Sequence, residues 1–278
     1  MSSTQLVPEL HASSPSVAQP APENIPAALE AALAPVFAAA HESSSLIASR
    51  TPIEVRGEAV EIPKFLLLGA RGGNTPIRLG FFAGFEAGNL ATVQAITRLL
   101  LQLKPSPGLT RDYALIAYPV TNIRGFTAEA APLSDFETRF ANDSAEADVR
   151  YFKNQLQQWT FDGLISIRTD HHARGYYAAV RSEIIAREVV EPALAVAAGA
   201  LPLATQAVKI RPGDRYARTA DYSYGRLSPA PDVRPYPFEI ELYVPRGGFQ
   251  DEHQDGLFVA ITEILRLYRT LIAHGQDL

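Results

Sequence analysis

Cysteine is absent from the 278 residues, and this absence excludes disulfide bonds, thiol catalysis and cysteine-ligated metal sites. A basic excess is also missing, because 25 Lys and Arg residues stand against 30 Asp and Glu residues. A net charge of −5 argues against a nucleic-acid-binding protein, which would carry clustered Lys and Arg. No stretch is apolar over the length that a membrane span needs. We therefore expect no nucleic-acid partner and no membrane partner, and a cytoplasmic location is the default expectation.

Residues 1–28 have no basic start followed by an apolar core, so they do not resemble a secretory signal. This segment is rich in Ser, Ala, Pro and Gln, which predicts a flexible leader. In the whole chain 47% of the residues are apolar, enough to build a sizeable core. We expect residues 29–278 to form one domain. No feature of the sequence indicates an oligomeric state.

Apolar patterns predict strands that alternate with helices along this domain. The helices are expected at 28–40, 90–103, 143–158, 181–200 and 255–273, and the strands at 55–68, 77–83, 113–120, 163–168 and 238–244. Such alternation predicts a single α/β domain with a twisted, mixed and mostly parallel sheet flanked by helices.

Local signals add four expectations about these elements. The short turn at 71–76 predicts that strands 55–68 and 77–83 form a hairpin, with Pro63 marking an edge or a bulge. Residues 143–146, Asp-Ser-Ala-Glu, are typical of a helix capping box. Pro192 lies inside the predicted helix 181–200. Segment 217–237 is weakly periodic, and a loop of that length is usually functional or mobile.

Polar residues collect where the predicted strands end. In open α/β sheets ligands bind at the carboxyl ends of the strands. The residues at four such ends are Glu86, Asn89, Asn122, Arg124, Arg168, Asp170, His171, His172 and Glu241. This mixed set is compatible with catalysis, with anion binding or with a polar rim.

The stretch "FFAGFEAGNLATVQAITRLL" resembles the flanks of a metal motif in the zinc carboxypeptidases and the related succinylglutamate desuccinylase and aspartoacylase deacylases. The resemblance covers roughly residues 50–275. In that superfamily a His-x-x-Glu pair follows the strand and binds zinc, and here Glu86 and Asn89 occupy the two positions. The strand "FDGLISIR" places Arg168 where the superfamily has its third zinc ligand, a histidine.

Three further stretches carry the resemblance. "YPVTNIRGF" is similar to a strand end of the superfamily. "FETRF" keeps Arg139, which the resemblance implies as the anchor for a substrate carboxylate, although Thr138 replaces the expected asparagine and the preceding arginine has no counterpart. "FEIEL" places Glu241 at the general base. The resemblance also implies a carboxypeptidase-like sheet of the phosphorylase/hydrolase type.

The resemblance therefore implies a former metal site, Glu86, Asn89 and Arg168, in which no zinc cofactor is retained. Zinc takes imidazole or anionic ligands, and a guanidinium stays protonated and cannot ligate a cation. We hypothesise that a Glu86–Arg168 ion pair replaces the metal. Asn89 also suits a helix N-cap, since it directly precedes the helix at 90–103.

Three functions stay open at this point. The first is a catalytically silent carboxypeptidase-like protein that binds a peptide tail or a small carboxylate through Arg139. The second is an active metallocarboxypeptidase or amide deacylase with rearranged ligands such as Glu86, Asp170 and His171, and with Glu241 as base. The third is a structural or interaction scaffold. Arg139 also suits a surface ion pair with Glu137 or Asp135, and His171 and His172 suit a solvated loop.

Overall fold

The computed structural model describes residues 25–55, 57–72, 75–127, 136–142, 144–210, 238–245 and 251–274. Within these ranges one eight-stranded sheet has the order β1-β2-β4-β3-β5-β8-β6-β7. The strands are β1 Leu46–Val55, β2 Glu58–Leu68, β3 Ile77–Phe82, β4 Tyr113–Tyr118, β5 Gly163–Asp170, β6 Tyr176–Val180, β7 Leu203–Ile210 and β8 Phe238–Pro245. Four of the seven neighbouring pairs are parallel, so the predicted mixed, mostly parallel α/β sheet is confirmed.

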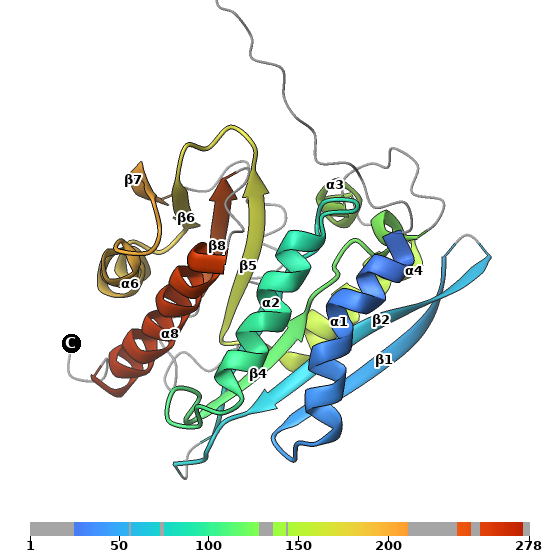
Figure 1. Cartoon of the computed structure of the whole chain (residues 1–278), viewed down its shortest axis with the longest axis horizontal. Helices are drawn as coiled ribbons and strands as arrows, with labels where there is room; N and C mark the ends of the chain where they lie inside the picture. Colours follow the sequence, from blue (N-terminus) through green and yellow to red (C-terminus); the bar gives the residue numbers. More distant parts are fainter. Residues whose placement is uncertain are drawn as a thin grey trace, which may run out of the picture.

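The helices of the described residues cover both faces of this sheet. They are α1 Ile25–His41, α2 Leu90–Leu103, η1 Ile123–Phe126, α3 Phe136–Ala141, α4 Ala147–Trp159, α5 Glu183–Ile185, η2 Ala186–Val190, α6 Glu191–Ala197 and α8 Asp251–His274. Figure 1 shows α1, α2 and α8 side by side across one face. None of the described helices has an apolar stretch long enough to cross a bilayer.

The face opposite α8 is covered by α4. Side chains of a strand alternate between the two faces of a sheet, and Tyr113 and Tyr118 are an odd number of residues apart on β4. The hydroxyl of Tyr113 donates to the carbonyl of Leu265 in α8, at 2.6 Å. The hydroxyl of Tyr118 donates to the side chain of Gln155 in α4, at 2.8 Å. The core therefore has two layers, one on each side of a buried β4.

The predicted hairpin of 55–68 with 77–83 is wrong. The β2 strand pairs with β1 and β4, whereas β3 pairs with β4 and β5. The connecting residues bond to the start of β4 instead, because Gly69 N–H donates to the Tyr113 carbonyl and Ile77 N–H to the Asp112 carbonyl. The partner of β2 in a hairpin is β1, which the sequence analysis did not predict.

Pro63 lies in β2 opposite Arg50 of β1. On its other side β2 pairs with β4 only from Phe65 to Leu68. Pro63 thus has a neighbouring strand on the β1 side only. On the β4 side it is not paired, so its missing N–H costs no ladder hydrogen bond to β4. This placement agrees with the predicted edge character of Pro63.

Two helix predictions need correction. The capping box at 143–146 does not form as predicted, because α4 starts at Ala147 and its N-cap residue Glu146 makes no side-chain capping bond. The carboxylate of Glu146 pairs with Arg124 and Arg139 instead. The helix expected at 181–200 runs from Glu183 to Ala197 with the π-helical turn η2 in its middle, just before Pro192. Proline removes one N–H donor, and a π turn is one way to accommodate that loss.

The leader and the long loop fall largely outside the described residues. Of the leader 1–28, only residues 25–28 are described, and they form the first turn of α1. Segment 217–237 lies outside the described residues.

Candidate functional site

The turn Ala83–Asn89 connects β3 to α2 at the carboxyl edge of the parallel strands. It is held against the segment after β4 by three backbone hydrogen bonds, from Thr121 N–H to the Ala83 carbonyl, from Asn122 N–H to the Gly84 carbonyl and from Gly88 N–H to the Gly125 carbonyl. Gly84 has a φ of +63°, and a Cβ there would lie 2.6 Å from the Pro119 carbonyl oxygen. The turn therefore needs glycine at this position, both for its conformation and for the close packing.

Glu86 and Asn89 converge on the end of β5. The carboxylate of Glu86 accepts from the backbone N–H of Thr169 at 3.2 Å and from the Asn89 side-chain amide at 3.2 Å. The same amide donates to the Thr169 hydroxyl at 2.7 Å. The oxygen of the Asn89 side chain accepts from Ala91 N–H at 3.2 Å, so the predicted N-cap role of Asn89 is confirmed. Sequence reasoning missed Thr169, and its place directly after Arg168 was the only local signal.

Arg168 is buried, with 7% of its surface exposed. Its Nε donates to the Ser166 hydroxyl at 3.2 Å, and one terminal nitrogen lies 3.4 Å from a carboxylate oxygen of Glu241. The guanidinium carbon lies 4.2 Å from the centre of the Phe85 ring, a cation–π contact. The other Glu241 oxygen accepts from the Tyr243 hydroxyl at 2.9 Å.

The hypothesised Glu86–Arg168 ion pair is not among the salt bridges between described residues. Strand register explains why Arg168 pairs with Glu241. On the paired strands β5 and β8, Ser166 lies opposite Glu241 and Arg168 opposite Tyr243, so all four side chains share one face of the sheet. Glu86, in the β3–α2 turn, accepts the N–H of Thr169 instead.

Burial raises the pKa of Glu86, while the Thr169 N–H and the nearby charge of Arg168 act in the opposite direction. Burial dominates because a carboxylate loses more by leaving water than these contacts return. The charge of Arg168 therefore lowers the pKa of Glu86 through space.

Arg139 lies in a second cluster, at the start of α4. One terminal nitrogen lies 2.8 Å from Asp148 and 2.5 Å from Glu146, and the other donates to the side-chain oxygen of Asn122 at 3.1 Å. The side chains of Arg139 and Asp148 are only 6% and 1% exposed. Arg139 is therefore buried and paired with Asp148, not at the surface, while Asp135 and the side chain of Glu137, its alternative partners, lie outside the described part of the structure. The carboxylate-anchor role of Arg139 stays a prediction, and a ligand would have to compete with two carboxylates for it.

His171 and His172 are exposed, as the solvated-loop alternative predicted. The carboxylate of Asp170 accepts from the Tyr177 hydroxyl at 2.9 Å and from the His172 N–H at 2.9 Å. Among the described residues, no three His, Asp or Glu side chains are grouped closely enough to hold a metal ion. Glu86, Asp170 and His171 therefore do not form a metal-binding group in the described part of the structure.

The side chains at the three expected metal positions do not suit zinc. Both oxygens of Glu86 accept hydrogen bonds, Asn89 caps a helix, and Arg168 brings a permanent positive charge. A guanidinium offers only donors, and it repels a dication. No catalytic step through a metal follows from this geometry.

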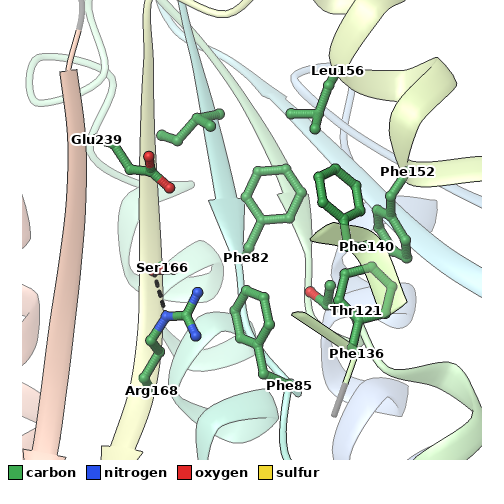
Figure 2. Close-up of a pocket in the computed structure, with 11 residues that line it drawn as sticks. Phe82, Phe85, Thr121, Phe136, Phe140, Phe152, Leu156, Ser166, Arg168 and Glu239 are labelled. Carbon is green, nitrogen blue, oxygen red and sulfur yellow. Dashed lines mark hydrogen bonds between the residues drawn. The ribbon is translucent and has the colours of Figure 1, made fainter. Parts of the chain in front are cut away.

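A pocket opens beside Arg168 on the α4 face of the sheet. Its volume is about 50 Å³. Its walls are mostly apolar, and Thr121, Ser166, Arg168 and Glu239 are its polar lining residues; the others are Phe82, Phe85, Phe136, Phe140, Phe152, Leu156 and Leu164. Figure 2 shows the phenyl rings gathered on one side of the Arg168 guanidinium, with the Thr121 hydroxyl among them. No pattern in the sequence predicts this pocket, since its rings come from β3, α3, α4 and the β3–α2 turn.

No protein-family model and no curated protein sequence matches the chain. Its fold matches that of a metallo-carboxypeptidase from Burkholderia cenocepacia, at a TM-score of 0.59 and 14% identity, over 89% of this chain and 68% of that one. A metallo-carboxypeptidase from Pseudomonas aeruginosa, in complex with (2-guanidinoethylmercapto)succinic acid, matches at 0.55 and 17%, over 88% and 68%. An aspartoacylase family protein from Mesorhizobium loti matches at 0.51 and 13%, over 80% and 68%. These similarities confirm the fold that the resemblance implied, and at such identities they establish the fold alone.

Proposed function

We propose that this chain, which has the fold of the metallo-carboxypeptidases, does not hydrolyse peptides with zinc and instead binds a small carboxylate or a peptide C-terminus. The observation that carries the proposal is the buried guanidinium of Arg168 at the end of β5. The resemblance assigns that position to a zinc-binding histidine. A fixed positive charge there opposes a dication and favours an anion.

Glu241 keeps the position of a general base in this proposal but has no base function. Its carboxylate is engaged by the Tyr243 hydroxyl and lies 3.4 Å from Arg168. A general base must reach the proton that it removes, commonly that of a water molecule made acidic by a metal. With Arg168 in place of a metal ligand, Glu241 instead neutralises a buried cation.

The experiment measures zinc content and hydrolysis for the full chain purified without chelator. We expect far less than one zinc per chain, and no release of amino acids from peptides or from acyl-amino acids. About one tightly held zinc together with hydrolysis, as expected of catalytic zinc sites, would overturn the proposal in favour of a metallohydrolase with rearranged ligands.

A triple variant tests whether these positions are those of a metal centre. Glu86→His, Asn89→Glu and Arg168→His together restore the residue types that the resemblance assigns. We expect this variant to bind zinc with a stoichiometry near one, measured by calorimetry, whereas Arg168→His alone binds it weakly. A folded triple variant with no zinc affinity would contradict the assignment of these positions and would favour an interaction scaffold.

A further inference from the structure

We infer that the outer edge of β1 is a latent surface for pairing with β1 of a second copy of this chain, and that Pro52 keeps this surface closed. The inference is independent of the proposed function, because three strands lie between β1 and the strand that carries Arg168. The length of β1, the direction of its backbone groups and the position of one proline lead to it.

The strand β1 is long and lies at the edge of the sheet. All ten of its residues, Leu46–Val55, pair with β2, and no other described strand pairs with it. Figure 1 shows β1 as the outermost strand beside β2. Such an edge presents a row of backbone N–H and C=O groups to which another chain can add as a further strand. An edge of this length therefore promotes self-association unless a residue interrupts it.

One hydrogen bond shows which residues of β1 direct their backbone groups outward. Leu68 N–H donates to the Ser45 carbonyl at 2.8 Å, and these two residues continue the register of the β1–β2 ladder. In an antiparallel ladder, hydrogen-bonded pairs alternate with pairs whose backbone groups point away from each other. The next residue, Gly69, accordingly bonds on the other side of β2, to the Tyr113 carbonyl. The even-numbered residues of β1 therefore point their N–H and C=O groups toward the free edge.

Pro52 occupies one of these outward positions. It lies opposite Glu61 of β2, and its side chain is exposed. A proline at this position removes an N–H that a further strand would need, but it removes no bond to β2, because that N–H would point away from β2. Proline on an edge strand is one of the ways in which proteins prevent edge-to-edge pairing. The position of Pro52 fits this role.

A second copy has one register on this edge that suits the charges of β1. Antiparallel pairing about a twofold axis at Pro52 places Arg50 opposite Glu54 of the partner subunit, and the symmetry repeats this contact. Arg50 can keep its contact with Glu30, at 2.7 Å, because a guanidinium carries five N–H donors. In the same register each Pro52 faces its own copy, so both central donors are missing. The proline thus blocks the register that the charges favour.

Sedimentation velocity of the full chain at increasing protein concentration tests the inference. We expect Pro52→Val and the less apolar Pro52→Thr to double in mass as concentration rises, with self-association at least about tenfold stronger than that of the wild type, because two ladder hydrogen bonds form at the axis. In the associated form, hydrogen exchange of the amides of residues 50–54 should slow. Urea denaturation at low concentration shows that the variants are folded. Folded variants that associate no more than the wild type overturn the inference.

Two further variants test the direction and the register. Ser49→Val adds the same side chain at an exposed position of β1, but the backbone of Ser49 is directed toward β2, so its association should equal that of the wild type. Glu54→Lys in the Pro52→Val background places like charges opposite each other and should weaken association about threefold or more. If Ser49→Val associates as strongly as Pro52→Val, or if Glu54→Lys has no effect, the contact lies elsewhere and the inference fails.

Discussion

Arg139 and Arg168 are both buried guanidinium groups in the same domain, but their carboxylate neighbours differ. Arg139 contacts both oxygens of Asp148, at 3.0 and 2.8 Å, and Glu146 as well. Arg168 lies 3.4 Å from Glu241 and borders an apolar pocket. The double contact of Arg139 with Asp148 favours a structural role for Arg139, whereas Arg168 lies at the end of β5 beside a pocket.

The buried Arg139–Asp148 pair gives a prediction about stability. Asp148→Ala leaves a buried guanidinium without its one buried carboxylate partner among the described residues, and we expect a loss of about 3–5 kcal/mol in the free energy of unfolding. Glu30→Ala is the matched control, because the Arg50–Glu30 contact is 2.7 Å long but Glu30 is 57% exposed, and it should cost about 0–1 kcal/mol. Urea denaturation of both variants measures the difference, and equal losses would refute a structural role for the Arg139 cluster.

Glu86 gives a prediction about pH. Burial raises its pKa, so ionisation costs more in the folded state than in the unfolded chain. The stability associated with protonated Glu86 is present below the unfolded pKa of about 4.3 and is lost as pH rises through the higher folded value. Relative to Glu86→Gln, the wild type should lose stability over this rise. Denaturation at a series of pH values measures this trend, and a difference that stays constant with pH would contradict it.

At the scale of the element, the β3–α2 turn owes its shape to glycine. Gly84→Ala places a Cβ 2.6 Å from the Pro119 carbonyl at a φ of +63°, and Gly57→Ala changes a residue with φ of +84° and open surroundings. We expect about 1–2 kcal/mol of destabilisation for Gly57→Ala and about 1–3 kcal/mol more for Gly84→Ala. Thermal denaturation of both variants separates two costs. Gly57→Ala reports the strain of a positive φ alone, and the additional loss in Gly84→Ala reports the collision of the new Cβ with Pro119. Similar losses would mean that Pro119 moves aside easily.

The elements predicted well from sequence are the ones that neighbours bury on both sides. β4 is buried at every residue, and α2 has the predicted bounds of 90 and 103. β1 and β7 were missed because they lie at the two edges of the sheet and alternate irregularly between half-buried and exposed residues. β6 was missed as well, although it lies inside the sheet and all five of its residues are buried, so burial does not account for every outcome. Strand pairing was missed for a different reason. Nothing near residues 69–76 indicates that the chain passes the start of β4 before β3 begins.

In the candidate site, too, some features can be predicted from the sequence and others cannot. The resemblance placed Glu86, Asn89 and Arg168 together, and Thr169 does connect the first two to the end of β5. It did not identify Glu241 as the partner of Arg168, because that contact depends on the register of β5 against β8. The pocket depends on rings from three separate segments, which are β3 with the turn after it, α3 and α4. Contacts of this kind are set by the tertiary structure and leave no local pattern.

At the scale of the whole molecule, the burial that made the central strands predictable should also make them the last to open. β4 lies inside the sheet, with β2 and β3 as neighbours and a helix on each face, whereas β7 pairs with β6 alone among the described strands and has exposed residues. Amide hydrogens of β4 should therefore exchange only through global unfolding, and those of β7 through local opening, at rates higher by about 100-fold or more. Hydrogen exchange followed by mass spectrometry measures both strands in one experiment. Equal protection of β7 and β4 would show that the sheet opens as a single cooperative unit.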